Sequence, residues 1–129
     1  MNSDKLISNK LKLLLVEDDE VNAKIILRFI GEEYLTDWVR TGDHAIDLAG
    51  KKNYDGILMD ISLVGELDGL MTTARIREIT GYSSTPIIAV TAYAMVGDKE
   101  KFLKGGCSHY ISKPFSKSEL LFLLKKIFS

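Results

Sequence analysis

Short apolar runs alternate along the chain with longer stretches in which apolar residues recur every three or four positions. Residues 11–16 form such a run, broken only by Lys12, as expected for a strand buried on both faces of a sheet. Residues 19–33 follow with the spacing of an amphipathic helix that stops near Gly31. The apolar positions of this predicted helix are Val21, Ile25, Ile26, Phe29 and Ile30.

The same alternation continues to the end of the chain. Further strands are predicted at 34–39, 54–59, 86–90 and 109–112. Helices are predicted after the turn at 41–43, over 68–80, over 95–104, and after a cap at Ser116 or Ser118. Because strands and helices alternate strictly, the sequence predicts an α/β fold, a doubly wound five-stranded parallel sheet with five helices covering its two faces.

The size and composition of the chain fit one globular domain. It has 129 residues, of which 46% are hydrophobic and 27% charged, and its formal net charge is −1. We assign residues 1–10, which are polar and unpatterned, to a flexible tail, and 11–129 to the domain. Lys and Arg are scattered, which argues against direct nucleic-acid binding. Cys107 is the single cysteine and no apolar run approaches the ~18 residues of a membrane span, so we expect a cytoplasmic protein without membrane contact.

Polar residues follow several of the predicted strands directly. Acids occupy 17–19 after the first strand, Asp60 ends the third, Thr91 ends the fourth, and Lys113 follows the fifth. In a doubly wound fold the carboxyl ends of parallel strands converge on one edge, where ligands bind. Gathered carboxylates repel each other unless a cation is present, and all-oxygen ligands without His or Cys favour Mg²⁺. The sequence therefore predicts a magnesium site at this edge.

The hydroxyl and ammonium groups predicted at the same edge suit phosphoryl chemistry. Thr91 and Lys113 could hydrogen-bond or neutralise the equatorial oxygens of a phosphoryl group. Asp60 ends the most apolar strand, so we expect it to lie deepest and to act as the nucleophile. Glu17 and Asp18 are expected at the rim, where they could hold the metal. The pattern indicates phosphoryl transfer to a carboxylate.

Four short motifs resemble receiver domains of two-component response regulators. They are Leu-Leu-Val-Glu-Asp-Asp-Glu-Val-Asn at 14–22, Ile-Leu-Met-Asp at 57–60, Ala-Val-Thr-Ala at 89–92 and Tyr-Ile-Ser-Lys-Pro-Phe at 110–115. The resemblance spans residues 11–128, and the family's flavodoxin-like (βα)5 fold agrees with the alternation of elements. It implies that Glu17 and Asp18 hold Mg²⁺.

The resemblance also implies roles for the other residues of this edge. Asp60 would be the phosphoacceptor and the carbonyl of Ser62 a further metal ligand. Thr91 would be the switch hydroxyl, and Tyr110 the aromatic residue whose ring turns inward when Thr91 is drawn to the phosphoryl group. Lys113 would bind the phosphoryl group and precede a cis peptide bond. The loop after Asp60 departs from the family pattern because it lacks the usual Met-Pro pair and is one residue longer.

The function implied by the resemblance is that of a phosphorelay switch. A phosphohistidine of a sensor histidine kinase or of a histidine phosphotransfer protein would donate its phosphoryl group to Asp60, and a change of surface shape would carry the signal. The chain would not be an enzyme beyond this self-directed transfer and autodephosphorylation. Because it ends after the fifth helix, it would be a stand-alone receiver or part of a hybrid kinase.

One aromatic residue of the last predicted helix does not fit its core-facing stripe. If Leu120, Leu124 and Ile127 face the core, Phe122 points nearly the opposite way. Around the helix circumference it lies between Lys125 and Lys126. It is either a lone exposed aromatic or part of a surface for a homodimer or a downstream target. That surface would combine the fourth helix at 95–104, the fifth strand at 109–112 and the last helix.

Three other functions fit the sequence less well. A haloacid dehalogenase-type phosphatase also forms an aspartyl phosphate but needs a second acid two residues after the nucleophile, where Ser62 stands. A flavin or dinucleotide module needs a glycine-rich phosphate loop after the first strand, where acids stand instead. A degenerate receiver that only binds partners is disfavoured by the presence of Asp60, Thr91 and Lys113.

Overall fold

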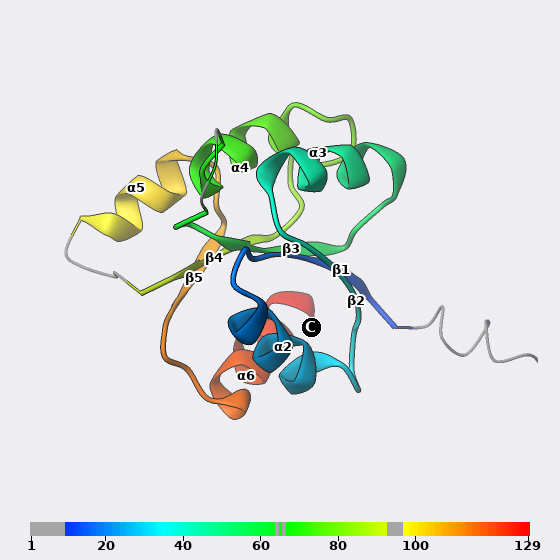
Figure 1. The fold of residues 1–129 in the computed structure, drawn as a ribbon, viewed down its shortest axis with the longest axis vertical. Coiled ribbons are helices and arrows are strands. Elements are labelled where there is room, and N and C mark those ends of the chain that lie inside the picture. Colours follow the sequence, from blue (N-terminus) through cyan, green and yellow to red (C-terminus); the bar gives the residue numbers. More distant parts are fainter. Residues whose placement is uncertain (1–9, 64, 66, 93–96) are drawn as a thin grey trace, which may run out of the picture.

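The computed structural model describes residues 10–63, 65, 67–92 and 97–129. These residues form one parallel sheet with the strand order β2-β1-β3-β4-β5 (Figure 1). The strands are β1 Lys12–Val16, β2 Leu35–Val39, β3 Gly56–Asp60, β4 Ile87–Thr91 and β5 His109–Ser112. The helices are α2 Glu20–Ile30, α3 Gly42–Lys51, α4 Gly69–Arg77, α5 Asp98–Lys104 and α6 Lys117–Phe128. The predicted doubly wound α/β fold is confirmed.

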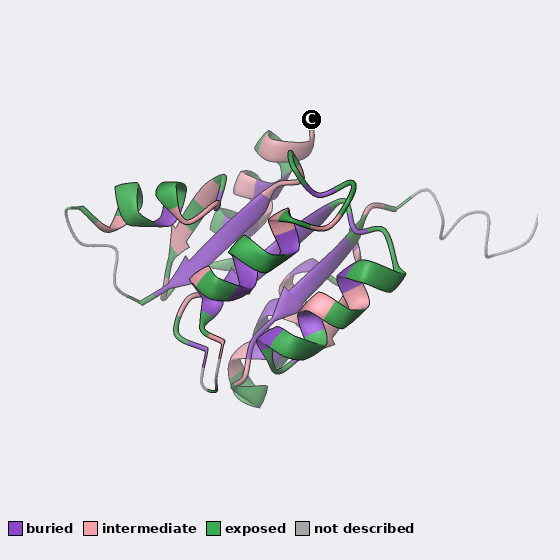
Figure 2. Ribbon diagram, turned by 90° about the horizontal axis from the view of Figure 1, so that it is seen from above, coloured by how far each residue is buried: buried purple, intermediate pink, exposed green. Residues whose placement is uncertain are grey.

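The sheet separates two hydrophobic layers, because successive side chains of a strand point to opposite faces. Leu14 and Met59 pack beneath α3, α4 and α5, whereas Leu15 and Leu58 pack against α2 and α6 (Figure 1). Every residue of β3 and β4 is buried. Figure 2 shows the buried strands between helices whose outer faces are exposed. The end of β3, where Asp60 lies, is therefore supported from both sides.

Side-chain caps fix where four of the helices begin. Asp19, Thr41 and Asp68 each accept a hydrogen bond from a backbone amide in the first turn of α2, α3 and α4. Of the two serines considered for the last helix, Ser116 caps α6 and Ser118 lies inside it. No helix among these described residues is long and apolar enough to cross a membrane.

The apolar stripe predicted for residues 19–33 is only partly buried. Ile26 and Ile30 of α2 lie in the core, but Val21 is 64% exposed and Ile25 44% exposed. At 100° per residue, Val21 lies nearly opposite the direction shared by Ala23, Ile26 and Ile30. Five apolar residues cover more of the helix surface than one face of a sheet can bury, so two of them remain in solvent.

One side chain joins two loops at the amino ends of β4 and β5. Arg77 ends α4 three residues before the predicted end at 80. Its Nε and Nη2 donate to the carbonyl of Gly106 at 2.9 and 2.7 Å. Its Nη1 donates to the carbonyls of Tyr82 at 2.7 Å and Thr85 at 2.6 Å. The segment after α4 and the segment before β5 are thus held by the same guanidinium group.

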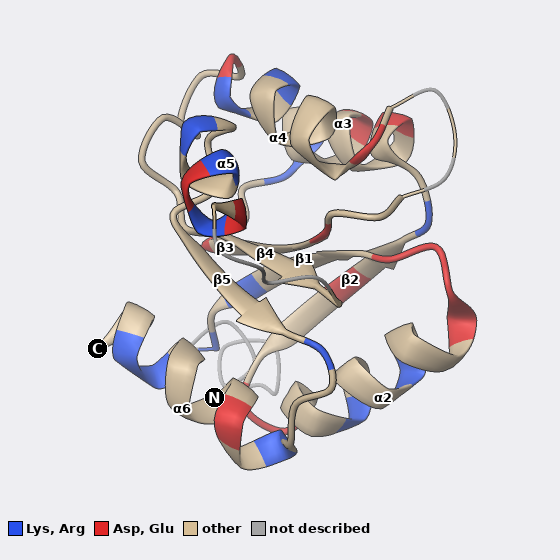
Figure 3. Ribbon diagram, turned by 90° about the vertical axis from the view of Figure 1, so that its left-hand side faces the viewer, with Lys and Arg blue, Asp and Glu red and all other residues tan. Residues whose placement is uncertain are grey.

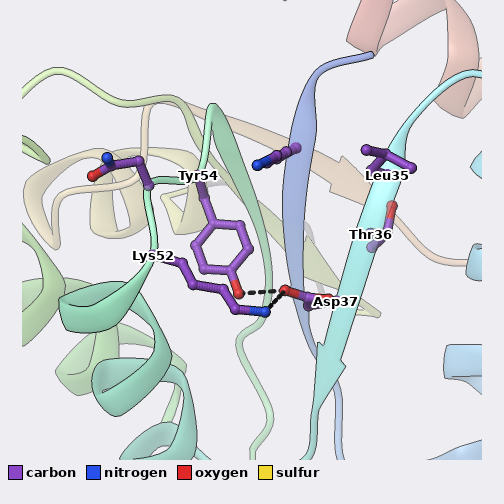
Figure 4. A pocket seen from close by; sticks show the side chains of 7 residues that line it. Leu35, Thr36, Asp37, Lys52 and Tyr54 are labelled. Atoms are coloured by element: carbon purple, nitrogen blue, oxygen red, sulfur yellow. Dashed lines mark hydrogen bonds and ion pairs between the residues drawn. The ribbon is translucent and has the colours of Figure 1, made fainter. Parts of the chain in front are cut away.

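A hollow of about 500 Å³ lies at the amino ends of β1 and β2, away from the predicted site (Figure 4). Within it, Asp37 accepts hydrogen bonds from the Tyr54 hydroxyl at 2.6 Å and from Lys52 Nζ at 3.1 Å. The hydrogen bond from Tyr54 is the main cause that lowers the pKa of Asp37. These contacts connect the loop before β3 to the edge strand β2.

Several sequence predictions fall outside the described residues. The tail predicted at 1–10 does so except for Lys10, and the predicted start of the fourth helix at 95–96 does so as well. Within the altered loop after Asp60, positions 64 and 66 are not described. The domain boundary at residue 11 therefore stays a prediction.

Candidate functional site

Three carboxylates converge at the carboxyl edge of the sheet. Glu17 and Asp18 follow β1, and Asp60 ends the adjacent parallel strand β3. One carboxylate oxygen of each residue lies within 4.8 Å of the others. The structure thus brings together the acids that the sequence placed at separate strand ends.

The depth of these acids differs from the prediction. We expected Glu17 at the rim and Asp60 deepest, but Glu17 is 1% exposed and Asp60 4%. The reason is that the Glu17 amide still donates to the Val39 carbonyl at 3.0 Å, so this residue prolongs the β1–β2 pairing instead of starting a loop. Asp18, the next residue, is half-buried. Only Asp18 occupies the expected position at the rim.

A lysine from the end of β5 lies between the two buried acids. Lys113 Nζ is 3.0 Å from Glu17 Oε1 and 4.0 Å from Asp60 Oδ1. The Lys113 amide donates to the carbonyl of Thr91 at 2.7 Å, which prolongs the β4–β5 pairing. The peptide bond from Lys113 to Pro114 is cis, as the family resemblance implied. The Lys113 ammonium group, which comes from the end of β5, therefore faces the carboxylates of Glu17 and Asp60.

The electrostatics of the cluster favour a divalent cation. The pKa of Glu17 is raised to about 7, mainly by burial and next by the hydrogen-bonded Asp60, while Lys113 partly opposes both. The buried carboxylates of Glu17 and Asp60 both face Lys113, and a carboxylate oxygen of Asp18 lies within 4.8 Å of theirs. The donors are all oxygens, which suits Mg²⁺. Glu17, Asp18 and Asp60 therefore fit the ion by number, chemistry and separation.

The remaining predicted site residues surround the acids in different ways. Thr91 is buried at the end of β4, and Ser62 donates its amide to Asp60 Oδ1 at 2.9 Å. The role of the Ser62 carbonyl stays a prediction. Tyr110 points outward at 37% exposure, with its ring tilted against Phe102 at a centroid distance of 6.4 Å. The aromatic residue predicted to turn inward is thus in its outward position.

The acidic run at 17–20 is divided between two tasks. Asp19 caps α2 through the Asn22 amide at 2.9 Å. Glu20 pairs with Lys24 at 3.3 Å and with Arg40 at 3.7 Å. Figure 3 shows this run as a continuous acidic segment between β1 and α2, with the basic residues spread over several helices. The first two acids of the run point into the site, and the last two stabilise the helix that follows.

Two residues beside the site were missed by the sequence analysis. The indole Nε1 of Trp38 donates to the Glu17 carbonyl at 2.8 Å. A Cβ atom at Gly69 would lie 2.3 Å from the carbonyl oxygen of Asp60, so the start of α4 can approach the acceptor strand only without a side chain. The Asp68-Gly69 pair could have suggested this close approach, whereas nothing in the sequence pattern pointed to the Trp38 contact.

Comparisons with known proteins agree with this geometry. The model of the response regulator receiver domain matches residues 13–125. The chain belongs to the receiver domain family. It is 41% identical over 114 residues to the polar-differentiation response regulator DivK of Brucella ovis, and the match covers 88% of this chain and 92% of DivK. DivK of Brucella anthropi matches with the same identity and coverage.

Solved receiver domains share the fold. The receiver domain of the sensor histidine kinase PA1611 from Pseudomonas aeruginosa PAO1 has a TM-score of 0.83 and 38% identity, and the match covers 91% of this chain and 96% of that one. That structure has a magnesium ion coordinated in its active site cleft. The chemotaxis protein CheY4 of Vibrio cholerae has a TM-score of 0.86 at 23% identity and supports the fold alone. The present receiver domain is thus a phosphoacceptor signalling domain of two-component systems.

Proposed function

We propose that this receiver domain accepts a phosphoryl group on Asp60 from a phosphohistidine of a sensor histidine kinase or a histidine phosphotransfer protein. The observation that supports the proposal is the convergence of the Glu17, Asp18 and Asp60 carboxylates within 4.8 Å, with Lys113 beside Glu17 and Asp60. We also place this chain in the cytoplasm. Beyond this transfer to itself and the later hydrolysis of its own phosphoryl group, we propose no enzymatic activity.

The transfer is an in-line displacement. A carboxylate oxygen of Asp60 attacks the phosphorus, the P–N bond of the donor breaks, and the leaving imidazole nitrogen keeps the electron pair and takes a proton from solvent. Glu17, Asp18, Asp60 and the Ser62 carbonyl would hold Mg²⁺, which would supply positive charge to offset the negative charge of the transferred phosphoryl group. Lys113 then exchanges its ion pair with Glu17 for one with a phosphoryl oxygen. The movement is short, since its ammonium nitrogen already lies 4.0 Å from Asp60 Oδ1.

The signal would then pass from Thr91 to Tyr110. The Thr91 hydroxyl hydrogen-bonds the new phosphoryl group, which adds charge near it and near Lys113. Movement of Thr91 leaves room for the Tyr110 ring, which now lies outward against Phe102. Incubation with acetyl phosphate and Mg²⁺ tests the proposal through the intact mass of the protein, and we expect one acid-stable, alkali-labile phosphoryl adduct.

We propose that the donor protein docks on α2 beside Lys113. A hollow of about 210 Å³ adjoins this lysine and has Ile25 and Phe115 in its walls. The exposed Val21 and Ile25 extend this apolar surface along α2. A phosphohistidine must reach Asp60 past this surface, so its protein would cover the two exposed side chains.

Ile25→Glu is expected to slow transfer from a protein donor by at least about tenfold, because a charge would be buried in the contact. The measurement uses a phosphorylated histidine phosphotransfer protein that phosphorylates the wild-type chain. Acetyl phosphate needs no docking surface, so its rate should stay unchanged. Phe122→Glu, on α6, is the matched control. Equal rates for Ile25→Glu and wild type with the protein donor would refute this docking surface.

Phe122→Ala is expected to weaken self-association or binding of a downstream target by about tenfold. Phe122 is 72% exposed, and Leu103 and Tyr110 are exposed on the neighbouring α5 and β5. We propose that α5, β5 and α6 together form the surface that binds a second copy of the chain or a downstream target. Sedimentation of the protein treated with beryllium fluoride measures the self-association, and a titration measures target binding. Ile25→Ala serves as the control, and unchanged behaviour of Phe122→Ala in both experiments would exclude the surface.

A further inference from the structure

Two consecutive residues of the edge strand β2 bind both backbone polar groups of Glu17, its amide and its carbonyl. The Glu17 amide donates to the Val39 carbonyl at 3.0 Å, and the Glu17 carbonyl accepts from Trp38 Nε1 at 2.8 Å. The pairing of β1 with β2 ends at Val16 and Val39, and the chain then turns toward Thr41, the N-cap of α3. A side-chain donor thus continues the hydrogen bonding where the backbone of β2 has turned away.

We infer that Trp38 is a positioning residue for the metal-binding acids, an inference that rests on the proposed Mg²⁺ site. The Glu17 carbonyl belongs to the peptide that joins Glu17 to Asp18, and this peptide is planar. A hydrogen bond to its oxygen therefore fixes the direction in which the chain leaves Glu17 and enters Asp18. The Asp18 carboxylate must meet those of Glu17 and Asp60 within 4.8 Å, so this direction affects the geometry of all three.

The surroundings of Trp38 hold its indole ring in the required place. The guanidinium carbon of Arg40 lies 4.8 Å from the ring centroid, a cation–π distance. Arg40 also pairs with Glu20 at 3.7 Å, at the start of α2. The ring packs against the hydrophobic layer between the sheet, α2 and α6. The indole is thus held from several sides, with its N–H group directed at the acidic run.

Loss of the indole N–H group should weaken Mg²⁺ binding without unfolding the protein. Trp38→Phe keeps an aromatic ring beneath Arg40 but removes the donor. We expect the Kd for Mg²⁺, measured by calorimetry, to rise about three- to tenfold, the effect of one lost hydrogen bond. Ile127→Ala is the control, because it removes packing in the same hydrophobic layer from α6, which carries none of the three acids. Its Kd should equal that of wild type.

A second replacement separates the donor from the shape of the ring. Trp38 is the single tryptophan of the chain, so growth with benzothienylalanine, whose ring sulfur replaces the N–H group, changes this position alone. The same rise in Kd is expected. An unchanged Kd in both proteins, or an equal rise in Ile127→Ala, would overturn the inference while leaving the Mg²⁺ site intact. Absence of Mg²⁺ binding by the wild type would instead refute the proposed function, and this inference with it.

Discussion

Asp60→Asn is expected to remove phosphorylation by acetyl phosphate, with a fall in rate of at least about a thousandfold, because the amide is not a nucleophile. The variant should fold like wild type. Asp60 Oδ1 accepts the Ser62 amide at 2.9 Å, and the side-chain carbonyl of Asn can accept the same bond. Intact mass after incubation with acetyl phosphate and Mg²⁺ gives the extent of reaction, and circular dichroism checks the fold.

Asp55→Asn is the matched control for this experiment. Asp55 lies just before β3, at the opposite end of the strand, where its carboxylate accepts the Lys12 amide at 2.8 Å. The phosphorylation rate of this variant should equal that of wild type. An adduct that persists in Asp60→Asn, with the same lability in alkali, would show that another carboxylate is the acceptor.

Glu17→Gln is expected to change metal binding and metal-free stability in opposite directions. It removes one of three acidic ligands, so stabilisation by Mg²⁺ should be lost. It also removes a carboxylate that is 1% exposed and faces Asp60. Without metal at pH 8, the variant should therefore be more stable than wild type. The difference is at most about 3 kcal/mol, the equivalent of the shift of the Glu17 pKa from 4.5 to about 7.

The pH dependence of this effect follows from the raised pKa. The folded state holds the Glu17 proton more tightly than the unfolded state, so the contribution to stability is complete below about pH 4.5. It is lost as the pH rises through about 7, where the folded protein also gives up the proton. Metal-free wild type should thus lose stability across this window relative to Glu17→Gln.

Urea unfolding at pH 5 and pH 8, with and without Mg²⁺, measures both effects. Asp18→Asn is the control for metal binding, since Asp18 is the half-buried acid of the cluster, whereas Glu17 is buried. It should also lose the Mg²⁺ stabilisation. If Glu17→Gln were less stable than wild type at pH 8 without metal, the ion pair with Lys113 would outweigh the cost of burying the charge, contrary to the raised pKa.

The sequence predicted the fold well because its strands are buried on both faces. Near-continuous apolar runs such as 54–59 have few other interpretations, and strict alternation with helices leaves a parallel sheet as the simple arrangement. Convergence of Glu17, Asp18 and Asp60 could also be predicted. It follows from the rule that parallel strands present their carboxyl ends on one edge.

The depth of each side chain could not be predicted in the same way. The burial of Glu17 depends on one more hydrogen bond of the β1–β2 pairing, which motif spacing does not specify. The exposure of Val21 and Ile25 depends on which arc of α2 meets the sheet. The Trp38 contact depends on the course of β2 beside β1. All three are properties of neighbouring elements, whereas periodicity describes one element at a time.

The guanidinium group of Arg77 anchors the amino ends of β4 and β5. Its displacement would leave the carbonyls of Gly106, Tyr82 and Thr85 without this donor, so the amino ends of both strands resist movement. Thr91 and Tyr110 lie further along these strands. We therefore expect a rearrangement that starts at the phosphoryl group to displace the carboxyl ends of β4 and β5 more than the amino ends that Arg77 holds.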